Sequence, residues 1–312
     1  GASCAGCDMA VIDIHEKILD VYAKADIVFS PTFVDFKIKD IEAMEDRSID
    51  VALYHGAVRN SENEEIAKLF RRKSKILIAF GSCACYGGIL SLANLTTKDK
   101  IFRTVYKDTV STENPEFVTP QPRYVDEDKY ELSIPEFYED VRALDDVVEV
   151  DYYLPLCPPT PDLIWTALTA IFSGNLPPKG SIIAKDKTLC SECPRTKSEK
   201  RRITKIYRPH EILYDSEKCF LDQGLICLGP VTRAGCGALC IEGNVPCRGC
   251  MGPTKETIDQ GGNILSMISS ILGVDIESLS DKDVKELISQ IKDPAGTFYR
   301  FTLAKSLLRK KR

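Results

Sequence analysis

The feature that most constrains this chain is its set of thirteen cysteines in 312 residues. Twelve of them sort into three groups of four, and three CxxC pairs stand out: Cys4/Cys7, Cys190/Cys193 and Cys247/Cys250. A gap of two residues lets both thiolates reach one inorganic centre, because the backbone between them can fold around it with its amides directed at the sulfurs. Three four-cysteine sites along one chain indicate a path for electrons rather than a single active site.

Two other uses of cysteine fit this spacing less well. Disulfide frameworks are typical of small secreted domains that cannot build a core, whereas 312 residues can bury a large one. Structural zinc commonly uses two CxxC pairs separated by a compact knuckle, but Cys4/Cys7 has no nearby partner pair. The spacing therefore favours iron–sulfur clusters, and zinc stays open as the alternative.

The overall composition limits the classes of partner that the chain can bind and the cellular compartment that suits it. A net charge of −5 argues against a nucleic-acid surface. No apolar stretch approaches the ~20 residues needed to cross a bilayer, so we expect no membrane span. No signal peptide is evident, and an opening of Gly1-Ala2-Ser3-Cys4 is compatible with residues lost upstream. So many unpaired thiols predict a reducing, cytoplasmic location.

The pattern of apolar residues predicts two domains, 1–176 and 177–312. In the first domain, helices are expected to alternate with strands over 26–36, 49–54, 75–80 and 147–156. Such alternation implies a parallel sheet with helices on both faces, interrupted by a polar surface insertion over 96–135. The second domain reads as irregular and helical. Its cysteine-rich segment 186–260 is expected to fold around inorganic centres that replace part of a missing apolar core.

The positions of four cysteines that lie far apart in the sequence suggest where they meet. Cys83 comes just after one predicted strand, and Cys157 follows another. Cys4 and Cys7 precede a predicted helix over 9–24, which suits a strand-to-helix loop. In open α/β sheets ligands sit beyond the carboxyl ends of the strands. These four cysteines are therefore expected to converge on one edge of the sheet.

Four motifs in this order resemble the small, electron-transferring subunit of nickel–iron hydrogenases. They are SCAGC (Ser3–Cys7), GSCACYGG (Gly81–Gly88), LCPPTPD (Leu156–Asp162) and LGPVTRAGC…VPCRGC (Leu228–Cys250). The resemblance spans nearly the whole chain. It is greatest to the cytoplasmic viologen-reducing type that associates with heterodisulfide reductase in methanogens and some bacteria. It implies a flavodoxin-like α/β first domain and an irregular, helical iron–sulfur second domain.

The resemblance also implies three 4Fe–4S clusters with cysteine ligands. The proximal cluster, which faces the nickel–iron centre of a separate large subunit, would take Cys4, Cys7, Cys83 and Cys157. The distal cluster would take Cys190, Cys193, Cys219 and Cys227. The medial cluster would take Cys236, Cys247 and Cys250, with Cys240 as the fourth ligand.

The chain departs from the family pattern at several positions. Many relatives use a histidine as the first distal ligand where this chain has Cys190, so His210 is expected to be a surface or loop residue. Many relatives hold a medial 3Fe–4S cluster with three cysteines, whereas Cys240 favours a 4Fe–4S cluster here. Leu156 stands where relatives often have glycine. Cys85 is interpreted as a buried free thiol, with a role as substitute ligand as the alternative.

The function that the resemblance implies is electron transfer without catalysis, since the chain offers no acid, base or nucleophile. Expected partners are the hydrogenase large subunit, a ferredoxin-like 2Fe–2S subunit of the delta type, and heterodisulfide reductase. This route serves flavin-based electron bifurcation in methanogenesis. Three alternatives remain: the small subunit of a deazaflavin-reducing hydrogenase, a zinc-stabilised interaction protein, and a freestanding ferredoxin-like carrier.

Overall fold

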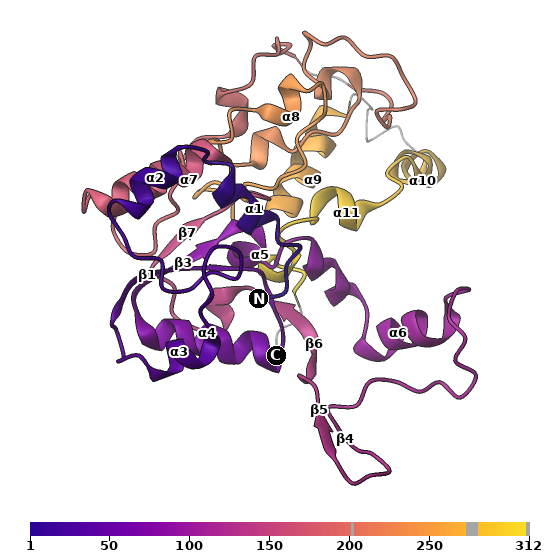
Figure 1. Ribbon diagram of the computed structural model, residues 1–312. Coiled ribbons are helices and arrows are strands. Elements are labelled where there is room, and N and C mark those ends of the chain that lie inside the picture. The colour runs from indigo at the N-terminus through magenta and orange to yellow at the C-terminus, as the bar shows by residue number, and fades with distance from the viewer. Residues whose placement is uncertain (201–202, 273–279, 310–312) are drawn as a thin grey trace. The chain divides into compact units, whose positions relative to one another are not determined.

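The computed structural model describes residues 1–200, 203–272 and 280–309 (Figure 1). The chain divides into two compact units: Gly1–Ile183 with the stretch that begins at Leu303, and Ala184–Thr302. The ranges expected from the sequence, 1–176 and 177–312, differ in giving the last residues to the second part. Lys305 accounts for the difference, because its Nζ lies 2.7 Å from carboxylate oxygens of both Asp145 and Asp146 in the first unit.

The first unit is built on a parallel sheet of strand order β1-β3-β7. Its strands are β1 (Ile49–His55), β3 (Ser74–Phe80) and β7 (Tyr152–Leu154). β3 is central and its last four residues are buried, which explains the apolar run KILIAF. Figure 1 shows α4 (Ser61–Lys73) on one face of this sheet and α7 (Pro161–Phe172) on the other. The α/β class with a parallel sheet and helices on both faces is therefore confirmed.

Two predictions for the first 40 residues are wrong. The segment 26–36 is not a strand, because Phe33 and Val34 donate backbone hydrogen bonds to Ser30 O in a turn that contains Pro31. The helix predicted over 9–24 is split into α1 (Gly6–Ile12) and α2 (Lys17–Tyr22). His15 lies between the two helices with φ 56°, a left-handed conformation that no α-helix continues through. β1 and β3 match the predicted strands, and α3 (Ile38–Ala43) precedes β1.

The insertion over 96–135 contains more secondary structure than its polar sequence predicts. It holds α6 (Lys98–Arg103) and a hairpin of β4 (Arg123–Val125) and β5 (Glu131–Ser133), whose residues are exposed. It ends before β6 (Phe137–Arg142), which pairs antiparallel with β2 (Val58–Asn60). Its exposure agrees with the predicted surface location.

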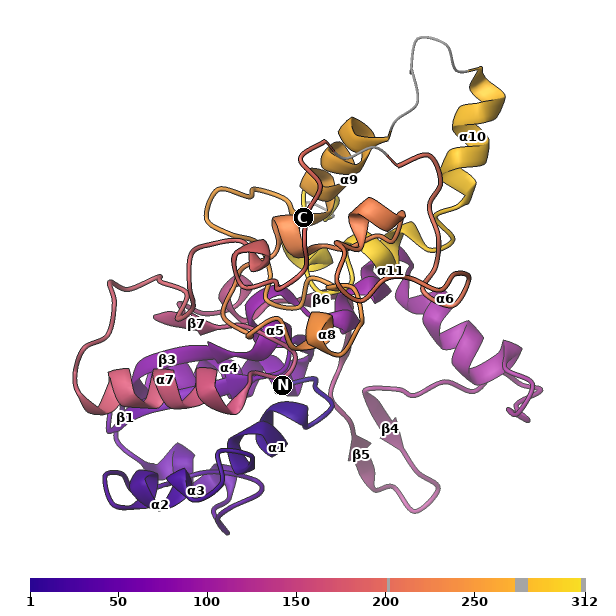
Figure 2. The same cartoon turned by 90° about the horizontal axis from the view of Figure 1, so that it is seen from above.

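The second unit has few long elements, and loops and short 3₁₀ turns connect them (Figure 2). Its helices are α8 (Leu239–Glu242), α9 (Gln260–Ile271), α10 (Asp281–Ser289) and α11 (Pro294–Phe298). A small apolar core includes Phe220, Leu221, Leu225 and Phe298, each 1% exposed. None of the helices in the described ranges is long and apolar enough to span a membrane.

One buried carboxylate fastens the central strands of the first unit. Asp151 is 2% exposed and accepts hydrogen bonds from Arg71 Nη1 at 2.6 Å and from Leu77 N at 2.8 Å. Lys179 Nζ lies 2.6 Å from its other oxygen. Burial acts to raise the pKa of Asp151, but these three donors prevail and lower it to about 2. Asp151 therefore joins α4, β3 and the start of β7 in its charged form.

We expect Asp151→Asn to lower the free energy of unfolding by about 3 kcal/mol, because it leaves Arg71 half-buried without its carboxylate. The pKa of Asp151 is depressed, so its contribution is present above the unfolded value of about 3.9 and is lost as the pH falls towards 2. Urea unfolding of the anaerobic protein between pH 2 and 7 measures both effects. Asp50→Asn is the matched control, because the Asp50 side chain is 81% exposed in its pair with Lys75 and should contribute little. Equal losses in the two variants would contradict this role of Asp151.

Candidate metal centres

Four cysteines of the first unit, Cys4, Cys7, Cys83 and Cys157, come together at the carboxyl edge of the β1-β3-β7 sheet. Cys83 lies in α5 (Gly81–Tyr86), which begins directly after β3, and Cys157 follows β7 by three residues. Cys7 lies in the first turn of α1, with its Sγ 4.0 Å from Phe80 O at the end of β3. The charges of Cys4, Cys83 and Cys157 all act on Cys7. The structure thus places these four thiols in one group.

Burial and mutual repulsion disfavour the thiolate forms of Cys7, Cys83 and Cys157. Burial first, and then the neighbouring cysteines, raise the pKa of Cys7 to about 12. The same causes raise the pKa of Cys83 to about 11 and also raise that of Cys157. A thiolate is the form that ligates a metal, so a bound cation would have to supply the missing positive charge.

Two glycines leave space beside the sulfurs of this group. Gly81 has φ 83°, and a Cβ placed there would lie 2.5 Å from Cys7 Sγ. Gly88 has φ 59°, and its Cβ would crowd the Cys83 side chain, 3.0 Å from Cys83 Cα. Both positions favour glycine for its left-handed backbone, and both keep the surroundings of a thiol clear. The residues present therefore fit an inorganic group bound between these loops.

Cys85 and Leu156 lie beside this group, and the charges of Cys7 and Cys83 also act on Cys85. Cys85 is 1% exposed, packs in the apolar core and donates from Sγ to Ala79 O at 3.3 Å. Burial raises its pKa well above the usual value, as expected for a free thiol. Leu156 has φ 96°, so a side chain here is strained. That conformation explains why a glycine suits the position before Cys157.

In the second unit, a second group forms around Cys227. The charges of Cys190 and Cys219 act on Cys227, whose thiol accepts backbone hydrogen bonds from Gly229 and Cys247. A Cβ on Gly229 would lie 3.5 Å from Cys190 Sγ and 3.6 Å from Cys227 Sγ. Burial raises the pKa of Cys227 to about 11. Cys193 follows the 3₁₀ turn Leu189–Ser191 that carries Cys190.

Arg195 fastens the Cys193 loop to the Cys219 loop. Its side chain is buried, and Nη1 donates to Asp215 O at 2.9 Å and to Lys218 O at 2.8 Å. Its guanidinium lies 3.7 Å from the ring centroid of Phe220. A cation–π contact and two backbone hydrogen bonds fix the relative positions of the two cysteine loops.

Glu192 likewise links the loop of Cys190 and Cys193 to the loop of Cys236. Its Oε2 accepts from Gly235 N at 2.9 Å and from Gly237 N at 3.2 Å, on both sides of Cys236. Its Oε1 lies 2.8 Å from Lys185 Nζ. The carboxylate between Cys190 and Cys193 therefore holds the loop of Cys236.

The last four cysteines come together as two pairs. The charge of Cys240 acts on Cys236, and that of Cys250 acts on Cys247. Cys247 is also influenced by Cys227 of the second group. Gly249 N donates to Cys247 Sγ at 3.4 Å. An amide hydrogen bond of this kind stabilises a thiolate ligand and tunes the potential of a cluster.

A buried polar network supports the loop of Cys247. Gln260 Nε2 donates to Thr232 Oγ1 at 3.0 Å and to Gly249 O at 3.2 Å. Thr232 Oγ1 donates in turn to Leu228 O at 2.6 Å. These bonds connect α9 to the 228–232 segment and to the loop between Cys247 and Cys250, and they make the geometry of both rigid.

Sequence reasoning missed the residues that position these loops. Glu192 and Arg195 both lie in the CSECPR stretch over 190–195, and two charged residues within or next to a CxxC pair were the available signal. His55 Nε2 lies 3.1 Å from Asp8 Oδ1, directly beside Cys7, a structural pairing that only the fold reveals. His210 is exposed, as predicted for a surface or loop residue.

A family model, two relatives and a solved structure are similar to this chain, and the two relatives match it over nearly its whole length. The family described as NADH ubiquinone oxidoreductase, 20 Kd subunit, matches residues 4–171. The F420-non-reducing hydrogenase iron-sulfur subunit of Archaeoglobus profundus is 44% identical over 99% of this chain and 95% of its own. The corresponding F420-non-reducing hydrogenase subunit of Methanothermobacter thermautotrophicus is 37% identical over 98% and 92%. A solved NAD⁺-reducing nickel–iron hydrogenase chain in the H₂-reduced state aligns with 56% of this chain and 89% of its own, at 32% identity and a TM-score of 0.48.

Proposed function

The chain belongs to the family of F420-non-reducing hydrogenase iron–sulfur subunits, which are small subunits of nickel–iron hydrogenases, and on this premise we propose that it conducts electrons away from the site of hydrogen oxidation. It is a non-catalytic subunit of an oxidoreductase, and its partner is the hydrogenase large subunit. The nickel–iron centre belongs to that partner. F420 is a deazaflavin, and the relatives are named F420-non-reducing hydrogenases. Their names therefore argue against the alternative of a deazaflavin-reducing hydrogenase.

We propose three iron–sulfur clusters with the ligands that the family resemblance implies. The observation that carries this proposal is the convergence of four thiols at the carboxyl edge of the sheet. Gly81 and Gly88 leave space beside two of these sulfurs. When bound, such clusters accept and release single electrons. The proposed proximal ligands are Cys4, Cys7, Cys83 and Cys157. The proposed distal ligands are Cys190, Cys193, Cys219 and Cys227, and the proposed medial ligands are Cys236, Cys240, Cys247 and Cys250.

The protein's own contribution is to hold these thiols in place and to set their electrostatic surroundings. Arg195 and Glu192 fix the loops of the second unit, and the Gln260 network fixes the loop of Cys247. Gly249 N supplies a hydrogen bond to a sulfur. Burial of Cys219, Cys227 and Cys247 excludes water and lowers the local dielectric, which strengthens the polar interactions around them.

We further propose that the electrons pass to a ferredoxin-like 2Fe–2S subunit of the delta type and then to heterodisulfide reductase, where flavin-based bifurcation occurs as part of methanogenesis. An all-thiolate distal site supports this route, because thiolates without imidazole give a lower potential. A cytoplasmic location stays a prediction of the same proposal.

Anaerobic purification with its native partners, followed by quantification of iron, nickel and subunits, tests the proposal directly. We expect roughly twelve irons on this chain, from three clusters of four, and nickel on the large subunit. Cys240→Ala should lower the total to about eleven if Cys240 is the fourth medial ligand. Wild-type protein with about eleven irons would make the medial cluster 3Fe–4S. Zinc without iron or nickel would overturn the proposed function.

A further inference from the structure

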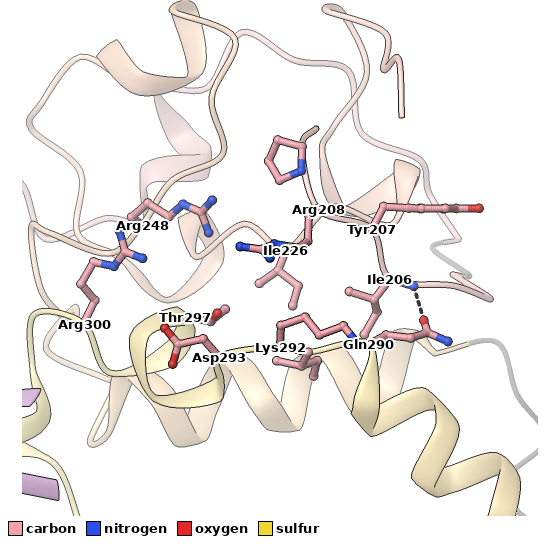
Figure 3. A pocket seen from close by; sticks show the side chains of 12 residues that line it. Ile206, Tyr207, Arg208, Ile226, Arg248, Gln290, Lys292, Asp293, Thr297 and Arg300 are labelled. Carbon is pink, nitrogen blue, oxygen red and sulfur yellow. Dashed lines mark hydrogen bonds between the residues drawn. The ribbon is translucent and has the colours of Figure 1, made fainter. Parts of the chain in front are cut away.

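The second unit contains a pocket with a volume of ≈ 120 Å³ that is rich in arginine (Figure 3). Its walls come from the 206–209 loop, from Ile226 and Arg248, and from the segment between α10 and α11 with the residues after it. We call it the arginine pocket, after Arg208, Arg248 and Arg300. In Figure 3 the side chains of Arg248 and Arg300 lie beside each other on one wall.

The charge of the arginine pocket is unbalanced. Lys292 adds a fourth cation, and Asp293 is the one carboxylate among the described lining residues. That carboxylate is engaged, because Asp293 Oδ1 accepts from Gly296 N at 2.9 Å at the start of α11. Within the part of the chain that the structure describes, none of the three arginines forms an ion pair with a carboxylate. The pocket is thus a local excess of positive charge in a chain whose net charge is −5.

The guanidinium group of Arg248 is repelled by its two arginine neighbours. The charges of Arg300 and Arg208 both act against that of Arg248, which is partly buried. An anion bound between these side chains would offset that repulsion.

We propose that the arginine pocket binds a small oxyanion, with phosphate and carboxylate as the chemical class. Planar guanidinium groups match the geometry of both, and several of them around one cavity give charge-assisted hydrogen bonds from different directions. Thr297 adds a hydroxyl to the same wall. A bound anion would offset the repulsion that acts on Arg248, whereas a neutral ligand would leave it in place.

The pocket lies one residue from two proposed cluster ligands, since Ile226 precedes Cys227 and Arg248 follows Cys247. A bound anion would cancel positive charge at this point and make reduction of the nearby clusters harder. This consequence rests on the proposed function, whereas oxyanion binding itself does not.

Isothermal titration calorimetry on the anaerobic protein with its native partners tests the proposal. Inorganic phosphate and acetate are titrated in separate arms, with chloride holding the ionic strength constant. We expect saturable binding at one site in at least one arm, and a loss of affinity of tenfold or more in Arg208→Gln, equivalent to about 1.4 kcal/mol. Arg208 is exposed, so its replacement should leave the fold intact. The arm with the higher affinity identifies the preferred oxyanion.

Arg103→Gln is the matched control, because Arg103 is an exposed arginine of the first unit that pairs with Asp108. It should bind as the wild type does, and Arg300→Lys should weaken binding as Arg208→Gln does. Absence of saturable binding in both arms, or equal affinity in Arg208→Gln and wild type, would overturn the proposal. A redox titration with the bound anion should show a downward shift of cluster potentials. Binding without that shift would count against the cluster assignment and leave the pocket in place.

Discussion

Cys83→Ala should remove about one iron, if a three-iron cluster survives, or up to about four irons from the chain, and lower hydrogen-dependent viologen reduction by about 100-fold or more. Cys83 lies in α5 at the carboxyl edge of the sheet, within electrostatic reach of Cys4, Cys7 and Cys157. Alanine at this position leaves three thiols at the site and no fourth ligand. Iron analysis and viologen reduction by the anaerobically purified complex measure the two effects.

Cys85→Ala is the control, two residues away in the same helix. Its thiol is 1% exposed and is bonded to Ala79 O within the apolar core. We expect the iron content and the activity to remain, with a loss of stability of about 1 kcal/mol from the small cavity and the lost hydrogen bond. The opposite result, with iron lost from the Cys85 variant and kept in the Cys83 variant, would make Cys85 the substitute ligand. Subunit assembly is checked in both variants, so that failed docking is not mistaken for a lost cluster.

The contrast between these two cysteines shows what sequence alone predicts about the site. The apolar run over 75–80 identified β3, and Gly81 identified its end, so the position of Cys83 at the sheet edge followed. Periodicity could not decide between Cys83 and Cys85. Both lie in the short helix α5, and its burial against β3 depends on the rest of the fold.

The errors in the fold have a related cause. The 26–36 segment has the composition of a strand, but a strand also needs a partner with free backbone groups. Ser30 instead accepts two turn hydrogen bonds from its own segment. The second unit was predicted only as irregular, because side chains such as Arg195 and Gln260 determine the course of its loops. Contacts of that kind join residues far apart in sequence and leave no periodic pattern.

Gly81→Ala should disrupt the first cysteine group without removing any of its thiols. The new Cβ would lie 2.5 Å from Cys7 Sγ, so the Cys7 side chain or the start of α5 must move. The backbone at φ 83° adds a strain of about 1–2 kcal/mol for any residue with a Cβ. We expect a loss of iron from this group and a fall in viologen reduction of about 10–100-fold, the range seen when the support of a metal ligand is removed.

Gly174→Ala separates the effect of backbone strain from the effect of the contact with the Cys7 sulfur. Gly174 follows α7 with φ 68°, and a Cβ there meets no atom within 4 Å. It therefore carries the backbone strain of Gly81→Ala without the contact to a thiol, and should cost about 1 kcal/mol of stability while iron and activity are retained. Iron analysis, activity and urea unfolding of the two variants side by side make the comparison. If both variants lose iron equally, backbone strain alone explains the effect and Gly81 has no special place beside Cys7. If only Gly81→Ala loses iron, the space next to the Cys7 sulfur is what the inorganic group requires.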